Sequence, residues 1–419
     1  MRTIALLIVV AALASAGGAA AQVTVLSNAT LIDGTGAAPQ SNVTIVMENG
    51  RIREIGPSAA VATPADATVV DLAGKYVVPG IINGHGHVGP APRDRQLRQY
   101  ALYGVTTTTS MAVDPDDIAA FKARQRAGDL QGARILTVKY RFTSAPMAGS
   151  DYKTPEAARA KVDEIAANGA DFVKVWIDPQ GGRHPRLSRE YCAAVLDQAR
   201  KHGLITMAHI VELDDARMIV EEGVNVLAHN VRDREIDADF IALLKARNVS
   251  VISTLAREEG MFIFGDGPAF TDNPFFQKGL TPGQRAAKAK KVEEQANDPQ
   301  RARLMRAFEI DKINLKKLAD AGVRVGFGTD SGGAPDRFFI QGFFEHRQME
   351  LMVQAGLTPM QVIQSFSKNN AEALGIDKDF GTLARGKAAD LLVLARNPLA
   401  DIANMRTIEA AYLGGRKFE

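Results

Sequence analysis

The stretch Val77-Val-Pro-Gly-Ile-Ile-Asn-Gly-His-Gly-His87 decides the fold of this chain. An apolar run is broken at Pro79-Gly80, and His85 and His87 follow two residues apart. Because residues i and i+2 of an extended strand lie on the same face, these two imidazoles can bind one cation. The stretch therefore predicts a strand that ends in metal ligands at the mouth of an α/β protein.

The rest of the chain repeats this pattern of an apolar strand followed by a polar ligand. Further candidate ligands end or follow strand-like runs, namely Lys174, His209, His229 and Asp330. Strands are expected at 104–111, 134–139, 172–177, 204–208, 224–228, 249–254 and 323–328, and helices at 154–168, 188–202 and 214–222. With the His85 strand this makes eight strands separated by helices, which predicts a (β/α)8 TIM barrel over residues 79–378.

Short β-branched runs with turn signals flank the barrel region. They predict that residues 22–78 form a small β-sandwich domain, completed by residues 379–419. Residues 256–312 are too long for a simple connection between the seventh and eighth strands. This insertion is either a lid or substrate wall, or a helical addition that packs elsewhere, for example in dimerisation.

The composition narrows the location and the partners of the protein. The net charge of +2 and the lack of a long basic run argue against nucleic acid or an anionic membrane as a partner. Residues 1–21 have the basic start, short apolar core and small-residue end of a signal peptide cut near Ala21. We therefore expect a periplasmic or secreted protein without membrane attachment after cleavage; an uncleaved anchor is the alternative. The single Cys192 is expected to be a buried structural thiol.

The candidate ligands indicate a divalent metal centre. Neutral imidazoles with one carboxylate are ligands that Zn²⁺ favours. Lys174 fits such a centre only if its amine is neutral or has reacted with CO₂ to form a carbamate, an anion that can bridge two ions. The alternative is a lysine whose stem packs beneath an exposed amine.

Several of these motifs resemble those of the amidohydrolase superfamily. Residues 78–87 resemble its first-strand signature, Gly104-Val-Thr-Thr107 its second strand, Gly328-Thr-Asp330 its eighth and residues 381–390 the segment that re-enters the β domain. Gly169-Ala-Asp-Phe-Val-Lys174 resembles the fourth strand of binuclear members related to prolidase-like dipeptidases and imidazolonepropionase.

The resemblance implies a complete site with two divalent metal ions. His85, His87 and Asp330 would bind one ion, His209 and His229 the other, and carbamylated Lys174 would bridge them. A hydroxide between the ions would be the nucleophile, and Asp330 would be the catalytic group that carries its proton to the leaving nitrogen. We expect hydrolysis of an amide bond in a dipeptide or N-acyl amino acid, by a homo-oligomer.

Some residues depart from this pattern and leave alternatives open. Asn83 replaces a common acidic residue, and Asn230 a common glycine. His209-Ile-Val-Glu212 matches the HxxE motif of mononuclear deaminases, and a cyclic amide or lactone hydrolase would use the same chemistry. Tyr140 and Arg141 are the predicted substrate-binding residues, with Arg141 able to bind a carboxylate through two hydrogen bonds. Rival anchors for a substrate carboxylate are Arg232, Arg234 and Arg257.

Overall fold

The computed structural model describes residues 23–89, 92–111, 117–129, 131–144, 154–179, 182–332 and 339–418. The expected signal peptide, residues 1–21, lies outside the described residues. Within the described ranges, no helix is both long enough and apolar enough to cross a membrane.

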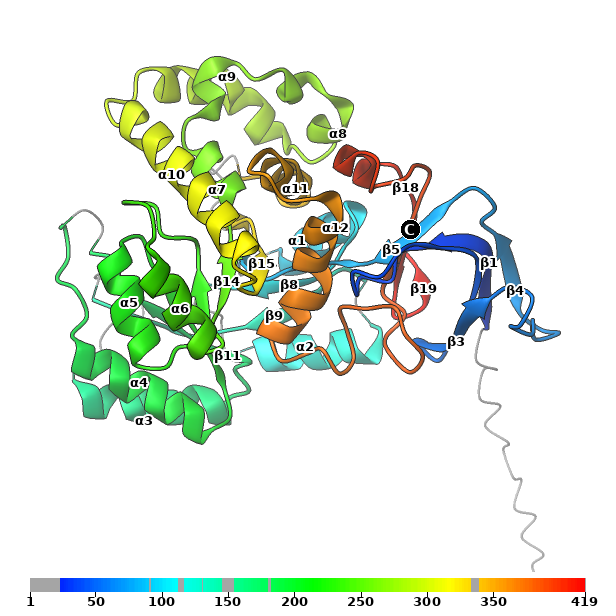
Figure 1. The fold of residues 1–419 in the computed structure, drawn as a ribbon, viewed down its shortest axis with the longest axis horizontal. Helices are drawn as coiled ribbons and strands as arrows, with labels where there is room; N and C mark the ends of the chain where they lie inside the picture. The colour runs from blue at the N-terminus through cyan, green and yellow to red at the C-terminus, as the bar shows by residue number, and fades with distance from the viewer. Residues whose placement is uncertain are drawn as a thin grey trace, which may run out of the picture.

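Parallel strands lie at the eight places where the sequence predicted them, and helices cover them (Figure 1). The strands are β6 (Ile81–Asn83), β8 (Val105–Ser110), β9 (Arg134–Thr137), β11 (Phe172–Trp176), β12 (Ile205–His209), β13 (Val226–Ala228), β14 (Ser250–Ser253) and β15 (Val325–Phe327). The intervening helices include α1 (Arg93–Leu102), α2 (Ile118–Ala127), α3 (Pro155–Ala167), α4 (Arg189–Lys201), α5 (Leu213–Glu221) and α6 (Ala238–Ala246). The chain thus has the α/β alternation that was predicted.

The strand ladder does not close into one continuous barrel. It consists of a three-stranded sheet β6-β8-β9, a six-stranded sheet from β10 (Arg141–Thr143) to β15, and the pair β16 (Ser331–Gly332) with β7 (Gly86–His87). The third strand is split because Lys139 has a φ of 56°, so β9 pairs with β8 while β10 pairs with β11. Single backbone hydrogen bonds link the sheets, from Asp171 to Thr137 (2.9 Å) and from Gly84 to Phe327 (2.9 Å).

The two ends of the chain share one sheet beside these strands. Its order is β19-β18-β17-β5-β1-β2-β3, with β4 also paired to β1, and the N- and C-terminal parts meet where β5 runs antiparallel to β17. The bounds are β1 Thr24–Leu31, β2 Gln40–Glu48, β3 Arg51–Pro57, β4 Thr68–Asp71, β5 Tyr76–Pro79, β17 Leu391–Leu394, β18 Ile408–Leu413 and β19 Arg416–Lys417. The predicted joining of the two ends is therefore correct.

The prediction of a two-sheet sandwich differs from this arrangement, because hydrogen bonds join all eight strands into a single sheet. The physical reason lies in β1, whose pairing with β2 shifts register between Leu26 and Ala29. The start of β1 pairs with β4 and its end with β5, so one strand connects what would otherwise be two layers.

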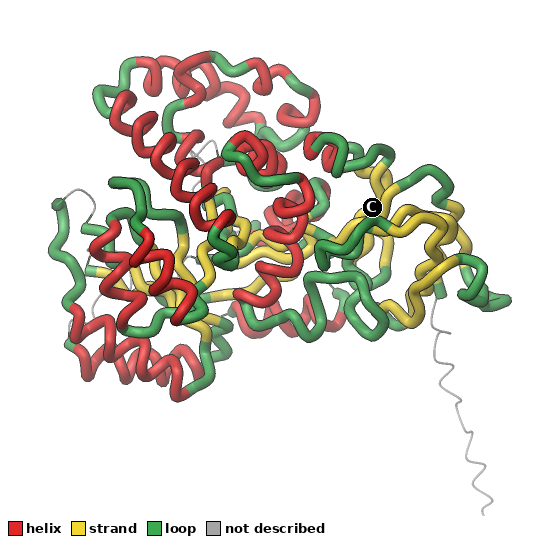
Figure 2. The backbone as a smooth tube through the Cα atoms, in the orientation of Figure 1, coloured by secondary structure: helices red, strands yellow, loops and turns green. Residues whose placement is uncertain are grey.

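The insertion forms a helical layer over the strands (Figures 1 and 2). It contains α7 (Leu255–Gly260), two 3-10 helices (Ile263–Asp266 and Ala269–Asp272), α8 (Pro274–Gln277), α9 (Pro282–Ala296) and α10 (Arg301–Asp320). The two long helices α9 and α10 are separated at the segment that contains Pro299, a residue that breaks helices.

The phenylalanines of the insertion pack against one another and against α11 (Phe343–Gln354). The rings of Phe276 and Phe343 meet edge to face with centroids 4.8 Å apart, and Phe270 lies 5.3 Å from Phe343. Phe264 and Phe276 are almost fully buried. These rings therefore attach the insertion to the core, and they give no support to the alternative in which they line a substrate wall.

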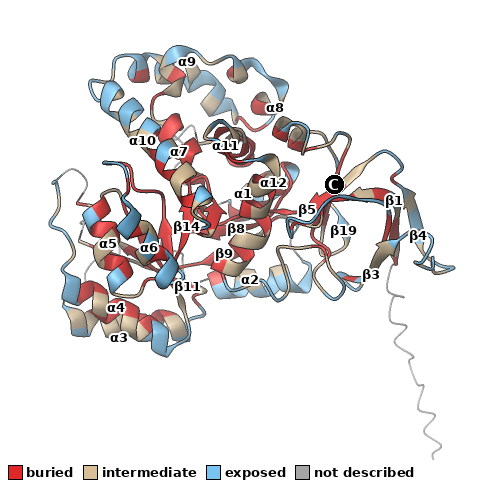
Figure 3. Cartoon of the chain, viewed as in Figure 1, coloured by how far each residue is buried: buried red, intermediate tan, exposed pale blue. Residues whose placement is uncertain are grey.

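Buried residues concentrate along the central strands (Figure 3). One apolar cluster contains one residue from each of the neighbouring strands β11 to β14, namely Phe172, Met207, Val226 and Ile252, together with Leu374. It forms a floor on the inner face of the strands, below the positions of the predicted ligands.

Candidate metal centre

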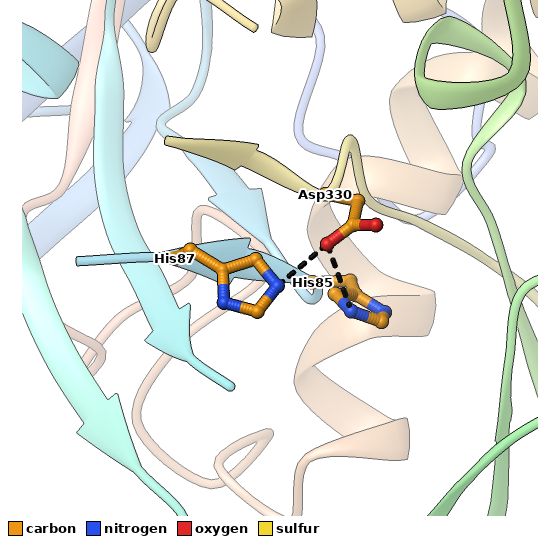
Figure 4. A group of neighbouring side chains, drawn as sticks. All are labelled: His85, His87 and Asp330. Carbon is orange, nitrogen blue, oxygen red and sulfur yellow. Dashed lines mark ion pairs between the residues drawn. The ribbon is translucent and has the colours of Figure 1, made fainter. Parts of the chain in front are cut away.

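Three of the predicted ligands form a compact cluster. One ligand atom from each of His85, His87 and Asp330 lies within 4.8 Å of the others. Asp330 Oδ1 is 2.5 Å from His87 Nε2 and 3.5 Å from His85 Nε2, and all three side chains point toward one another (Figure 4). The predicted first metal position is therefore geometrically reasonable.

The backbone around Asp330 holds this cluster in place. The amides of Thr329 and Asp330 both donate to the carbonyl oxygen of His85, at 3.1 and 2.7 Å. Asp330 has a φ of 52°, and His229 has a φ of 76°, so both residues occupy the left-handed region that non-glycine residues rarely adopt. Such strain persists where the surrounding structure enforces it, and it often marks a functional site.

Lys174 lies on the inner face of β11, above the apolar floor. It pairs in register with Arg141 of β10 and with Met207 of β12, and Phe172 lies two residues before it on the same face. The side chain is 2% exposed, and Nζ has no hydrogen-bond partner. The alternative of an exposed amine is therefore excluded; burial lowers the pKa of Lys174 to about 7.

His209 and His229 continue the line of imidazoles that His85 begins. The ring centroids of His85 and His229 are 4.5 Å apart, and those of His209 and His229 are 4.6 Å apart. His229 Nδ1 lies 2.6 Å from Thr254 Oγ1, while its Nε2 is buried without a partner. A histidine held through one nitrogen with the other left free is the usual arrangement of a metal ligand.

Electrostatics favour the ligand form of these groups. Burial holds the pKa of His85 and of His229 well below the usual range and lowers that of His209 to about 4, so all three imidazoles are neutral. Burial alone would raise the pKa of Asp330, but His87, His85 and Arg257 outweigh it and keep the carboxylate ionised. Neutral imidazoles, an ionised carboxylate and orphaned buried nitrogens fit a divalent metal ion.

A buried polar network supports the cluster from below. Glu345, in the first turn of α11, accepts hydrogen bonds from Asn83 (2.6 Å), Thr329 (2.7 Å) and Ser331 (2.8 Å). Asn83 also accepts the backbone amide of His85 at 3.0 Å. Sequence reasoning treated Asn83 only as a departure and missed Glu345 and Thr254. A weak signal existed for Glu345, an acidic residue that directly follows Phe343 and Phe344.

Arg257 reaches the same carboxylate from the insertion. Its Nε is 3.4 Å from Asp330 Oδ2, and its Nη1 donates to both oxygens of Glu258 at 2.8 and 2.9 Å. Glu258 also lies 3.2 Å from Arg232 Nε, so Arg232 is buried in this network. The rival anchor Arg234 instead forms a surface ion pair with Asp214.

The two predicted substrate-binding residues face different sides of their strand. Arg141 shares its register with Lys174, and its guanidinium carbon lies 5.5 Å from the centre of the Trp176 ring. Tyr140 is buried in the helix-side core, edge to face with Phe142 and beneath Lys161 of α3. Of the two residues, only Arg141 therefore lies beside Lys174.

Glu212, the residue of the deaminase-like motif, lies outside the cluster. Its carboxylate forms an ion pair with Arg186, which also approaches Asp215 at 3.2 Å. The Glu212 side chain is 38% exposed, whereas His85, His209 and His229 are buried.

The sequence of residues 76–417 matches the amidohydrolase family. The chain belongs to this family. The predicted family is therefore confirmed. The fold agrees, since a candidate prolidase structure from Bifidobacterium longum superposes with a TM-score of 0.77 and 26% identity, over 94% of each chain.

Curated relatives have several different activities. Enamidase from Eubacterium barkeri is 30% identical over 40% of this chain and 44% of its own length. An adenine deaminase from Moorella thermoacetica is 23% identical over 84% of this chain and 50% of its own. Imidazolonepropionase from Paracoccus denitrificans is 24% identical over 83% of this chain and 86% of its own. The chain thus spans about half the length of the enamidase and of the adenine deaminase.

Proposed function

We propose that this protein is an exported binuclear hydrolase that cleaves an amide bond in a dipeptide or an N-acyl amino acid. The observation that carries the proposal is Lys174, which is buried on the inner face of β11 without a hydrogen-bond partner. Leaving a buried ammonium unpaired is costly, so the position favours a neutral amine or a modified one.

A carbamate on Lys174 would remove this cost. The neutral amine adds to CO₂, its nitrogen forms the new N–C bond, and one proton is released to water. The product is an anion with two oxygens, placed on the strand beside β12, which carries His209. We propose that it would help to hold two divalent ions, with His85, His87 and Asp330 as the other ligands of one ion and His209 and His229 as those of the second. Zn²⁺ suits this donor set.

Divalent metal bound there would activate water at neutral pH and polarise the scissile carbonyl. The protein's own groups would position the substrate and move the proton. Asp330 is ionised and its Oδ1 faces His85 and His87, so Oδ2 would be the oxygen that takes a proton and returns it to the leaving nitrogen. Arg141 lies level with Lys174 on the neighbouring strand, where its guanidinium would bind the substrate carboxylate.

The test of this proposal is turnover of dipeptides and N-acyl amino acids by the parent and by Arg141→Met. We expect KM to rise at least tenfold in the variant with metal content unchanged, because the contact with the substrate carboxylate is lost while every proposed metal ligand is kept. An unchanged KM would remove Arg141 from the substrate site. No turnover of either substrate class by metal-replete parent protein would overturn the proposed reaction.

A mononuclear deaminase is the second candidate, since adenine deaminases are among the relatives. It would need Glu212 to shuttle protons, and the ion pair with Arg186 gives Glu212 a surface role instead. Ammonia release that is lost in Glu212→Gln but kept in Lys174→Ala would establish the deaminase.

The export proposal rests on residues 1–21 and is tested by N-terminal sequencing of the mature protein.

A further inference from the structure

A cavity lies at the opposite end of the central strands from the predicted metal ligands. It has a volume of about 1070 Å³ and is bounded by α2, by the turn after β2 and by β19. Thr106, Arg134 and Asp171 line it, and each lies at or just before the beginning of its strand. The ligand cluster follows the strand ends, so this cavity is a separate place in the fold.

The lining combines apolar and cationic side chains. The apolar side chains include Met47, Ile135, Leu136, Phe380, Leu413 and Phe418. Five cationic side chains line the cavity against two acidic ones, Glu48 and Asp171. Lys122 pairs with Asp171 at 2.5 Å and Arg134 with Asp390 at 2.8 Å, so the inner cations are already compensated.

The remaining cations are Arg126, Arg416 and Lys417. Among the described residues, none of the three has a carboxylate within ion-pair distance, and Lys417 and Arg126 are exposed. Arg416 reaches across the cavity, because its Nη1 lies 2.7 Å from the point where a Cβ on Gly128 would stand. Gly128 caps α2 with a φ of 81°, and the missing side chain leaves room for the guanidinium.

From this arrangement we propose that the cavity binds a small organic anion with an apolar body, such as a medium-chain carboxylate. Sites for small ligands are concave, mostly apolar, and frequently lie between structural units, as this one does. The carboxylate of the ligand would lie among Arg126, Arg416 and Lys417. Its alkyl chain would pack against the apolar side chains that line the cavity. This inference is independent of the hydrolytic reaction.

The test is a calorimetric titration with octanoate, in parallel with uncharged 1-octanol. Octanoate is expected to bind one site, and to bind at least tenfold more weakly to Arg126→Glu and to Arg416→Glu. Arg124→Glu is the matched control, since Arg124 lies on the same last turn of α2 but does not line the cavity. Its affinity should stay within about twofold of the parent.

Three results would overturn the proposal. These are the absence of saturable octanoate binding, an equal loss in Arg124→Glu and Arg126→Glu, and binding of 1-octanol as tight as that of octanoate. A titration of Lys174→Ala protein separates this cavity from the catalytic centre. Loss of octanoate binding there would assign the ligand to the metal centre and contradict the second site, whereas retained binding supports it.

Discussion

His229 and Asp330 each depend on a backbone conformation that the sequence does not display. Both have positive φ, and hydrogen bonds to the backbone of His85 hold Asp330. The sequence could indicate both residues as ligands, because polar residues after apolar strands are conspicuous. It could not show the orientation of the two side chains, because that orientation depends on residues elsewhere in the chain, such as Thr254 and Glu345.

Thr254→Val should weaken metal binding by about 10- to 100-fold, the usual effect of losing a residue that orients a metal-ligating histidine. Valine has the same shape as threonine, but His229 Nδ1 loses its hydrogen-bond partner, the Thr254 hydroxyl 2.6 Å away. Competition with a metal chelator measures the change. Thr254→Ser retains the hydroxyl and should stay near the parent; equal losses in the two variants would contradict a hydrogen-bonding role.

His346 makes folding stability depend on pH. Burial lowers its pKa to about 3, from an ordinary value of 6.5, and its Nε2 lies 2.9 Å from the carbonyl oxygen of Tyr103. Between these pH values the unfolded chain binds the proton more readily, so the native state loses stability as the pH falls below 6.5. The loss is at most about 1.4 kcal/mol per pH unit.

The free energy of unfolding, measured by urea denaturation at pH 7, 6 and 5, checks this expectation. The parent should lose more stability than His346→Gln over this range, because glutamine does not titrate. Parallel pH curves for the two proteins would show that His346 contributes no pH dependence.

At the scale of elements, periodicity predicted the central strands and helices well. Most of these strands are short apolar or β-branched runs. Thr154 caps α3, and its side chain accepts the amide of Ala157 as a helix cap should. The break between α9 and α10 and the split third strand were missed. Both arise from single residues, Pro299 and the left-handed Lys139, which do not disturb the hydrophobic pattern around them.

The insertion offers a test of what its aromatic residues do. Phe276 is fully buried against Phe343, so Phe276→Ala should destabilise the protein by about 3–5 kcal/mol. Met305, on α10 of the same insertion, is 38% exposed, and Met305→Ala should change stability by no more than about 0.5 kcal/mol. Urea denaturation measures both. A Phe276→Ala protein as stable as the parent, but with altered substrate preference, would instead favour a substrate wall.

For the whole molecule, the joining of the chain ends is the main structural constraint. β18 pairs with β17, and β17 pairs with β5, which directly precedes the strand that leads to His85. The sequence predicted this return from the strand-like residues 391–394, but not the single sheet, because register shifts such as the one in β1 depend on the partner strands.

Deleting residues 379–419 should therefore abolish the cooperative folding of the protein. The deletion leaves Val77 and Val78 of β5 without their partners Val393 and Leu392, and removes part of the buried cluster around them. The expected result is insoluble protein or the loss of a sigmoidal unfolding curve. A soluble truncated protein with a sharp transition would show that the central strands fold by themselves.

The most direct test of the central claim is the metal content per chain, measured by elemental analysis of protein prepared with bicarbonate and divalent metal. The account predicts two ions in the parent and fewer in Lys174→Ala, because the lysine would hold the two sides of the centre together. One ion in both proteins would contradict the bridged centre.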